Sequence, residues 1–323
     1  MQQGSAIVVE GLTKSFGDLR ALDGIDLEVD RGTVFGLLGP NGAGKTTAVR
    51  ILATVLAPDA GRAEVLGFDV VRDPEEVRLR IGLAGQYAAV DANLTGRENL
   101  HLIGKLAQVE PSRIAPRATE LLANFDLTDA ADRPVRTYSG GMRRRLDVAA
   151  SLVQKPPVLF LDEPTTGLDL QSRQELWRTI RGLVDEGTTV ILTTQYLEEA
   201  DQLADRLVVI DHGSIIAEGT ASQLKERLGG TVIELSMRDE AEVGTAASIV
   251  QPIAGAEPEV DGKVLRVPSP DGSHLLAQML RQLDDRGVFP ATVSLREPSL
   301  DDVFLALTGH GAEEPATEEG VPR

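Results

Sequence analysis

The sequence predicts an α/β protein in which a parallel sheet with helices on its faces is followed by a second, smaller α/β domain. Short apolar runs have the length of buried strands, and each is followed by polar residues and a helical pattern: residues 34–38, 158–161 and 189–193. A new alternation of strand and helix begins after Gly229 and Gly230. We therefore expect one domain over residues 1–230 and another over residues 231–310.

Composition limits the class of protein. The chain has 323 residues, enough for about two domains, and a formal net charge of −18. Such an acidic chain argues against a nucleic-acid partner, because phosphate backbones require a basic face. There is no cysteine, which excludes disulfides, thiolate catalysis and cysteine-ligated metals. No apolar run approaches the roughly 18 residues of a membrane span, and the N-terminus lacks a signal-peptide pattern, so we expect no transmembrane segment.

The first domain is expected to begin with strands and to contain a long helical stretch. Residues 7–9 and 27–29 have the pattern of short strands separated by polar turns. After the run at 34–38, the patterns indicate a helix at 45–53, a turn at 58–61, a helix at 74–80 and a strand at 81–84. From about residue 95 to 130 the pattern is helical, with breaks expected at Pro111 and Pro116.

A glycine-rich loop follows the first apolar strand. Residues 39–46 read Gly-Pro-Asn-Gly-Ala-Gly-Lys-Thr and fit G-x-x-x-x-G-K-[ST] at every position, between a predicted strand and a predicted helix. Glycines let several backbone N–H groups face one point, and the helix N-terminus adds a positive dipole end. Lys45 would contact the β- and γ-phosphates, and the Thr46 hydroxyl would ligate Mg²⁺. The residues expected to bind a nucleotide here are Gly39, Pro40, Asn41, Gly42, Ala43, Gly44, Lys45, Thr46 and Thr47.

Two carboxylates are expected at the same edge of the sheet. The apolar strand at residues 158–161 runs into Asp162 and Glu163. In a parallel sheet, the carboxyl ends of the strands open onto the crevice that holds the phosphate loop. We expect Asp162 to meet Mg²⁺ directly or through water, and Glu163 to orient or deprotonate the attacking water. A strand followed by Asp-Glu is commonplace by itself, and the glycine-rich loop is what makes this pair informative.

A second anion-binding helix terminus is predicted further along the chain. Residues 138–142 read Tyr-Ser-Gly-Gly-Met and open a predicted helix over residues 142–153, with Ser139 ahead of the two glycines. The glycine-rich loop, this segment and the Asp-Glu strand, in this order, resemble the ATP-binding subunits of ABC transporters. The resemblance covers about residues 6–228.

The resemblance has consequences for fold and assembly. It implies a P-loop NTPase fold of the ABC type, with a helical subdomain at about residues 87–155. It implies that Ser139, Gly140 and Gly141 close over the γ-phosphate of an ATP held by a partner subunit. Because one chain carries one copy of each half-site, two complete sites require a homodimer. ATP and Mg²⁺ are the implied cofactors.

Further positions match the pattern of the family one by one. Phe16 matches the aromatic residue that stacks on adenine, although a core phenylalanine is the alternative. Gln86 matches the glutamine that senses Mg²⁺ and water and contacts the membrane subunit, and Asp169 matches the loop that couples the two sites of the dimer. Gln195 occupies the switch position. The residues implied to act in hydrolysis are Lys45, Gln86, Glu163 and Gln195, and those implied to hold the metal are Thr46, Gln86 and Asp162.

The sequence departs from the commonest pattern of the family at two positions. Gln195 stands where most relatives have histidine, and Met142 stands where the signature segment usually ends in glutamine. Glutamine can donate a hydrogen bond to the γ-phosphate but cannot gain a proton charge, so the pH dependence should differ. Neither change removes Lys45, Asp162 or Glu163, so hydrolysis is expected to survive.

The second domain is expected to alternate strands and helices. The patterns indicate strands at residues 232–237, 264–267 and 292–295 and helices at 274–283 and 300–307. Ser299 with Asp302 three residues later predicts a capped start for the last helix, and Gly309 its end. Residues 311–323 are acidic and poor in large apolar groups, which predicts a disordered tail.

A narrower resemblance extends over nearly the whole chain. The segments that carry it are residues 138–147, 192–201 and 298–310. They resemble the daunorubicin/doxorubicin-resistance (DrrA-type) ATPases, in which the ATPase works with a separate membrane permease and powers export. This implies a peripheral location at the cytoplasmic face of the cell membrane. Residues 300–305 are implied to help assemble the complex, and the alternative is a capped helix that packs only within its own domain.

Alternatives to drug export stay open at this point. Lipid or glycolipid export fits the same ATPase role, because the permease and not this chain would form the substrate site. A membrane-free ABC protein and a non-catalytic nucleotide-gated regulator are further alternatives. Arg143, Arg144 and Arg145 raise a nucleic-acid interpretation, but such runs are usually solvated or ion-paired faces and the net charge opposes it.

Overall fold

The structure is a computed structural model that describes residues 4–86, 89–227, 231–255, 257–269 and 272–308. The chain divides into two compact units, with the division after Glu218. The expected helix end at Gly309 and the expected tail at residues 311–323 lie outside the described residues.

The first unit is built on a sheet with strand order β10-β9-β3-β8-β7-β6, in which β9, β3, β8, β7 and β6 run parallel. Its strands are β3 (Val34–Leu38), β6 (Ile81–Ala84), β7 (Val158–Asp162), β8 (Thr189–Thr194), β9 (Arg206–Asp211) and β10 (Ser214–Gly219). Every residue of β3, β7 and β8 is buried. Strands covered on both faces have no solvent side, which explains their apolar runs. The predicted parallel sheet is confirmed.

Alternate side chains of these strands face two different hydrophobic cores. Phe160 packs in the same core as Val49 of α1 (Lys45–Leu52). Leu161 packs in the same core as Leu176 of α6 (Leu170–Asp185). Helix α7 (Leu197–Leu203) follows β8 directly. The helices therefore hold the carboxyl ends of the parallel strands in fixed positions, and these ends carry the predicted site.

An antiparallel sheet covers part of the same unit, in the order β2-β1-β4-β5. Its strands are β1 (Ser5–Phe16), β2 (Leu19–Asp30), β4 (Ala60–Val65) and β5 (Phe68–Asp69), with α2 (Pro74–Arg78) after them. The short strands expected at residues 7–9 and 27–29 are wrong in length. Register shifts near Gly11, whose φ is +57°, interrupt the alternation that would have marked one long strand. The turn expected at residues 58–61 is also shorter, because β4 begins at residue 60.

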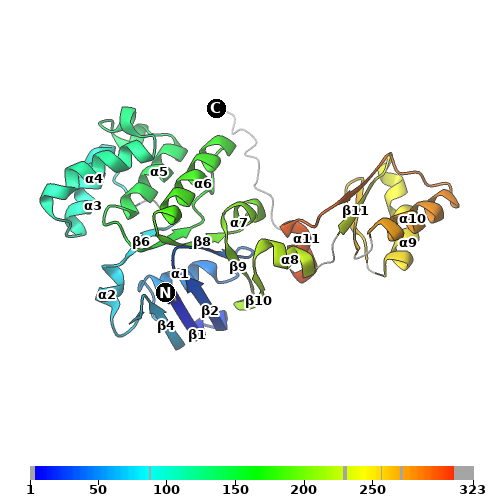
Figure 1. Ribbon diagram of the computed structural model, residues 1–323, viewed down its shortest axis with the longest axis horizontal. Coiled ribbons are helices and arrows are strands. Elements are labelled where there is room, and N and C mark those ends of the chain that lie inside the picture. Colours follow the sequence, from blue (N-terminus) through cyan, green and yellow to red (C-terminus); the bar gives the residue numbers. More distant parts are fainter. Residues whose placement is uncertain (1–3, 87–88, 228–230, 256, 270–271, 309–323) are drawn as a thin grey trace. The chain divides into compact units, whose positions relative to one another are not determined.

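A group of helices inserted after β6 forms the rest of the first unit (Figure 1): α3 (Gly96–Leu106), α4 (Pro111–Asn124) and α5 (Gly140–Ser151), with 3₁₀ turns at Thr128–Ala130 and Val135–Thr137. Thr95 and Glu98 form a capping box at the start of α3. Pro111 is the first residue of α4, as a helix start favours. The break expected at Pro116 is wrong, because α4 continues through this residue. The apolar face of the helix is buried on both sides of Pro116, at Ile114, Ala118, Leu121 and Leu122.

The second unit contains an antiparallel sheet in the order β12-β13-β11-β14. Its strands are β11 (Thr231–Ser236), β12 (Glu259–Asp261), β13 (Val264–Ser269) and β14 (Thr292–Arg296). Its helices are α8 (Ala221–Arg227), α9 (Glu240–Ala254), α10 (Gly272–Asp284) and α11 (Leu300–Thr308). Ile233, Leu235, Leu265 and Val267 form a core with apolar residues of α9 and α10. The predicted strands and helices are confirmed, and β12 was not expected.

The capped start of α11 is confirmed, and its contribution to the stability of the second unit can be measured. Asp302 Oδ2 accepts a hydrogen bond from Ser299 N at 2.6 Å, and Ser299 Oγ accepts one from Asp302 N at 3.2 Å. The Arg296 guanidinium donates to both carboxylate oxygens of Asp302, at 2.6 and 2.8 Å. Asp302 is buried. We therefore predict that Asp302→Ala destabilises the second unit by about 2 kcal/mol in urea unfolding.

The matched control for this prediction is Asp301→Ala, which changes an exposed carboxylate in the same helical turn and should cost less than about 0.5 kcal/mol. Burial of Asp302 opposes its ionisation, but hydrogen bonds from Arg296 and Ser299 outweigh burial and hold its pKa below the usual value. A lowered pKa stabilises the fold above the unfolded pKa, so the loss caused by Asp302→Ala should shrink as the pH falls below about 4. Equal losses for both variants would contradict the assignment.

Candidate nucleotide-phosphate site

The glycine-rich loop connects β3 to α1 and leaves no room for side chains at two positions. A Cβ on Gly39 would lie 2.2 Å from Ile210 O, and one on Gly44 would lie 2.4 Å from Ala21 O, where φ is also +113°. No side chain caps the start of α1. Its first N–H groups are therefore available to an anion, and they lie beside a loop whose close packing requires glycine.

Lys45 places a buried cation at this loop. The residue is only 4% exposed. Its Nζ donates to Gly39 O at 2.7 Å and to Pro40 O at 3.0 Å, and lies 3.8 Å from Glu163 Oε1. Burial lowers the pKa of Lys45, and the carboxylates of Glu163 and Asp162 oppose that change. The ammonium is thus held in the loop by carbonyl groups and faces the end of β7.

The end of β7 brings two carboxylates to the loop. Asp162 Oδ1 accepts hydrogen bonds from Thr46 Oγ1 at 3.0 Å and from Thr193 Oγ1 at 2.6 Å. Glu163 N donates to Thr193 O at 3.1 Å and to Thr193 Oγ1 at 3.0 Å. The backbone of Glu163 is left-handed, with a φ of +49°, which is uncommon for a residue other than glycine. The structure thus brings Lys45, Thr46, Asp162 and Glu163 together.

The oxygen atoms at this point suit a divalent cation. The Thr46 hydroxyl and the Asp162 carboxylate are oxygen donors 3.0 Å apart, and oxygen donors are the ligands that Mg²⁺ prefers. Thr193 is the residue that sequence reasoning missed. Its hydroxyl hydrogen-bonds to the Asp162 carboxylate and to the Glu163 backbone N–H. The sequence signal that could have identified Thr193 is its place as a polar residue near the end of an apolar strand.

The predicted second helix terminus, at Ser139, and the predicted coupling residue Asp169 lie at the N-termini of two other helices. Ser139 caps α5, where its Oγ accepts from Met142 N at 3.2 Å. Asp169 caps α6, where its carboxylate accepts from Ser172 N and Oγ, both at 2.9 Å. A Cβ on Gly141 would lie 2.9 Å from Ser172 Oγ, so the two helix starts are neighbours. In the described part of the chain, the hydrogen bonds of Ser139 and Asp169 do not reach Lys45 or the carboxylates at the end of β7.

Comparisons with known proteins decide the family. The family model "ABC transporter" matches residues 22–166. The daunorubicin resistance ATP-binding protein DrrA2 of Streptomyces coeruleorubidus is 56% identical over 98% of this chain and 99% of its own length. The chain belongs to the ABC transporter ATP-binding family. The daunorubicin/doxorubicin resistance ATP-binding protein DrrA of Streptomyces peucetius is 51% identical over 99% of this chain and 97% of that protein.

Solved structures agree with the fold of an ABC ATP-binding subunit. An ATP-binding cassette of an ABC transporter in its ADP conformation has a TM-score of 0.62 at 26% identity, over 68% of this chain and 92% of that one. The expected P-loop NTPase fold of the ABC type is confirmed. As a member of this family the chain binds adenine nucleotides and is the ATP-hydrolysing subunit of a transporter. In the part of the chain that the structure describes, no helix is both long and apolar enough to cross a membrane.

Two glutamines of this ABC ATP-binding subunit follow strands of the same sheet. Gln86 is exposed just after β6, and Gln195 comes directly after β8. Because β6, β7 and β8 are neighbours and parallel, both residues follow the strand ends that flank Asp162 and Glu163. Gln195 Oε1 is buried and has no hydrogen-bond partner in the described part of the chain. A buried amide oxygen of this kind can accept a hydrogen bond from a ligand or an ordered water.

Phe16 ends β1 with its ring facing solvent. The residue is 49% exposed, so the alternative of a core phenylalanine is wrong. Lys14 Nζ lies 5.7 Å from the centroid of the ring. Lys14 Nζ is also paired with Asp59 Oδ1 at 2.8 Å, so the feature that suits a nucleotide here is the exposed aromatic ring, a flat surface on which a base can stack.

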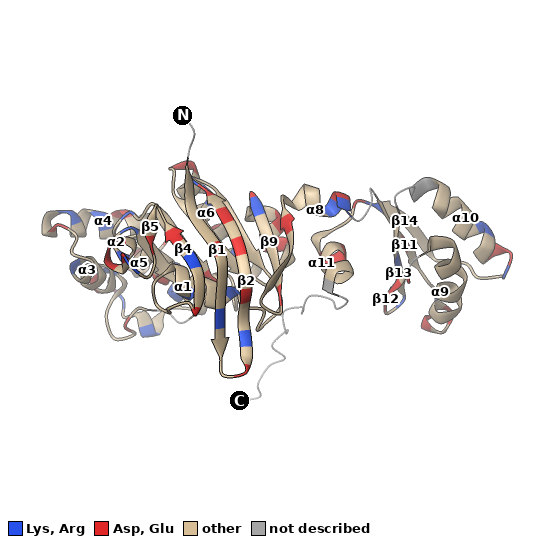
Figure 2. Ribbon diagram, turned by 90° about the horizontal axis from the view of Figure 1, so that it is seen from below, with Lys and Arg blue, Asp and Glu red and all other residues tan. Residues whose placement is uncertain are grey.

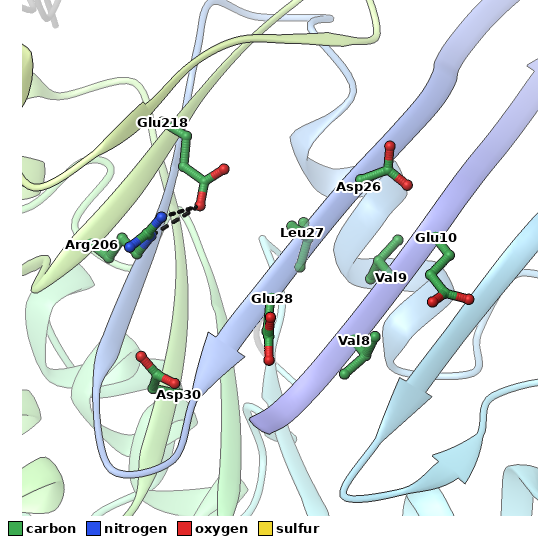
Figure 3. Close-up of a pocket in the computed structure, with 9 residues that line it drawn as sticks. All are labelled: Val8, Val9, Glu10, Asp26, Leu27, Glu28, Asp30, Arg206 and Glu218. Carbon is green, nitrogen blue, oxygen red and sulfur yellow. Dashed lines mark hydrogen bonds and ion pairs between the residues drawn. The ribbon is translucent and has the colours of Figure 1, made fainter. Parts of the chain in front are cut away.

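The hollow on the outer side of the antiparallel sheet is a different kind of surface (Figure 3). It has a volume of about 500 Å³ and is lined by Val8, Val9, Glu10, Asp26, Leu27, Glu28, Asp30, Arg206 and Glu218. Arg206 is neutralised by Glu218, whose Oε1 lies 2.8 Å from its Nη2. The remaining charges are carboxylates, which repel phosphate. Basic and acidic side chains are also interspersed along β1, β2 and β4 (Figure 2).

Proposed function

We propose that this chain powers the export of hydrophobic drugs, such as daunorubicin, through a separate permease. It works as a homodimer that encloses two MgATP at the cytoplasmic face of the membrane. The observation that carries this proposal is the extent of the similarity to the daunorubicin resistance proteins. It spans 98% and 99% of this chain and therefore includes the second unit as well as the ATP-binding unit.

The phosphate side of each ATP site comes from one chain. The loop N–H groups and the start of α1 bind the β- and γ-phosphates, and Lys45 contributes the charge that stabilises the transferring phosphoryl group. Thr46 and Asp162 would hold Mg²⁺, which neutralises charge on the phosphate oxygens. Glu163, 3.8 Å from the Lys45 ammonium, orients the attacking water and accepts its proton. Gln86 and Gln195 contact water or the γ-phosphate from the neighbouring strand ends.

The other side of each site comes from the second chain. Ser139, Gly140 and Gly141 present the N-terminus of α5 to the γ-phosphate held by the partner. Asp169, at the neighbouring start of α6, couples the two sites across the dimer. Closing and reopening of the dimer then drives the permease between its inward- and outward-facing states.

Drug efflux from cells tests the proposal directly. Cells that co-express this chain and its permease partner should lose preloaded daunorubicin faster than cells with the permease alone. The matched control carries Glu163→Gln, and it should behave like cells that lack the ATPase. An ATPase-active pair that moves no daunorubicin would overturn drug export and leave ATP hydrolysis intact.

We predict that Phe16→Ala weakens ATP binding without slowing the chemistry. Loss of ring stacking costs about 1–1.5 kcal/mol, so the Kd for ATP should rise about tenfold while kcat stays within twofold. Phe16→Trp should restore the affinity. Val71→Ala, which trims another exposed apolar residue of the first unit, is the control and should leave the Kd unchanged. An unaltered Kd in Phe16→Ala would remove Phe16 from the site.

A further inference from the structure

Tyr196 follows Gln195 directly, and its backbone is held on both sides. Its N–H donates to Thr194 Oγ1 at 2.9 Å, and its carbonyl oxygen accepts from Ala200 N at 3.2 Å. The Thr194 side chain therefore closes a short turn in which Gln195 is the middle residue. The turn begins where β8 ends, beside the end of β7 that carries Asp162.

The Gln195 side chain itself is not fixed through its amide oxygen. That oxygen is buried and has no hydrogen-bond partner in the residues that the structure describes. A glutamine has three side-chain torsions, and ordering a long side chain opposes binding entropically. The direction of this amide therefore depends on how firmly the turn holds the backbone before and after Gln195.

Arg173 holds the ring of Tyr196 from the neighbouring helix. Its guanidinium carbon Cζ lies 5.2 Å from the centroid of the Tyr196 ring, which is within the range of a cation–π contact. The side chain is 16% exposed, and its Nε is buried without a hydrogen-bond partner in the described residues. Arg173 lies in the first turn of α6, where its N–H donates to Asp169 O at 3.0 Å. A hydrogen-bonded helix backbone thus presents the cation to the ring.

A second contact of Arg173 is weaker. Its Nη1 lies 3.7 Å from Glu198 Oε2, but the Glu198 side chain is 60% exposed, and an ion pair open to solvent contributes little. A cation–π contact that is shielded from water is stronger than an exposed one. The Tyr196 ring is therefore the partner that sets the position of the guanidinium.

We propose that Arg173 is a positioning residue for Gln195, because its contact with Tyr196 fixes the turn at the end of β8 and so keeps the glutamine amide in one direction. This inference rests on the proposed function, in which Gln195 contacts water or the γ-phosphate. In the described part of the chain, the Arg173 side chain contacts Tyr196 and Glu198 and forms no hydrogen bond or ion pair with Lys45. The arginine therefore acts through the turn and not on the reacting atoms.

The proposal predicts a change in kcat without a change in nucleotide affinity. Arg173→Met keeps much of the aliphatic stem and removes the cation. We expect kcat to fall about fivefold, which equals about 1 kcal/mol and lies in the range of one cation–π contact. The Kd for MgATP should stay within about twofold, because Lys45 is held by the loop carbonyls and not by this turn. Arg173→Lys, which keeps a cation that can lie over the ring, should retain most of the activity.

Double-mutant cycles identify the partner and the residue that is positioned. Tyr196→Phe keeps the ring and should retain activity, whereas Tyr196→Leu should lose about fivefold in kcat. Gln195→Ala should lower kcat by at least the same factor. Arg173→Met should cause no further loss in a Tyr196→Leu chain or in a Gln195→Ala chain, because the contact, or the side chain that it positions, is then already gone.

The matched control is Arg181→Met, on the same helix. Arg181 Nη1 lies 2.9 Å from Asp205 Oδ1, and its Nη2 donates to Gln202 O at 3.3 Å. It therefore also joins α6 to α7, but at the ends of these helices away from Gln195. This variant should change the Tm and leave kcat within about twofold of wild type.

Amide exchange reports on the turn without any ATPase activity. Exchange of the Tyr196 N–H, which donates to Thr194 Oγ1, should accelerate about tenfold in Arg173→Met and stay unchanged in Arg181→Met. The proposal is overturned if Arg173→Met leaves kcat and this exchange unchanged, or if its effect on kcat adds fully to that of Gln195→Ala. A Gln195→Ala chain with the wild-type rate contradicts the proposed role of Gln195 instead, and Tyr196 exchange then decides whether Arg173 holds the turn.

Discussion

Glu163→Gln should stop steady-state ATP hydrolysis and leave ATP binding intact. A positioned general base contributes about 10²–10⁴ in rate, so we expect kcat to fall at least about 100-fold. The amide has the same shape as the carboxylate but cannot accept a proton from water. Glu163 Oε1 lies 3.8 Å from Lys45 Nζ, and loss of this negative charge also removes repulsion from the triphosphate. ATP affinity should therefore stay equal or increase.

The matched control for this result is Glu186→Gln, which makes the same change at an exposed position after α6. It should hydrolyse ATP at the wild-type rate. Phosphate release gives kcat, and equilibrium binding of a fluorescent ATP analogue gives the Kd. Full ATPase activity in Glu163→Gln would assign the base to another residue.

Lys45→Met should abolish ATP binding instead of the chemical step alone. Methionine keeps most of the aliphatic stem but removes the ammonium that now donates to Gly39 O and Pro40 O. A charged hydrogen bond contributes about 1.5–3 kcal/mol, and Lys45 would make such bonds to both the β- and γ-phosphates. We therefore expect the Kd for MgATP to rise at least about 100-fold.

The opposite patterns of these two variants make the test specific. Lys45→Met should lose binding, and Glu163→Gln should keep it, although the two side chains are neighbours. Circular dichroism and thermal unfolding of Lys45→Met check that the chain is folded, since burying methionine there leaves the two carbonyl acceptors unpaired. A folded Lys45→Met with wild-type ATP affinity would contradict the assigned phosphate site.

The parallel sheet and its phosphate edge could be predicted because their signals are local. A strand buried on both faces is mostly apolar, as β7 is, and an apolar run is visible in a sequence. The phosphate loop has no room for side chains at Gly39 and Gly44, and the glycines that this requires are also visible in the sequence. Asp162 and Glu163 were found because the end of a strand is visible in the sequence. Only the structure shows that Lys45 lies beside Glu163 and that Thr46 donates a hydrogen bond to Asp162.

Other features depend on tertiary contacts that leave no local mark. The length of β1 was missed because bulges near Gly11 break its alternation. Helix α4 continues through Pro116 because burial of its apolar face outweighs one lost backbone hydrogen bond. The partners of Arg144 are the backbone carbonyls of Gly85, Asp162 and Pro164. Every residue has a backbone carbonyl, so a sequence does not show which of them a side chain will contact. The arginine run therefore had the pattern of a charged surface.

The stoichiometry of the ATP-bound state tests the central claim most directly. Glu163→Gln chains with saturating MgATP should sediment as dimers that contain two ATP, and as monomers when ATP is absent or Lys45→Met is added to the same chain. Such a result would show that two phosphate loops and two signature helices enclose two nucleotides. Chains that bind ATP with one site each but stay monomeric at every ATP concentration would contradict the account.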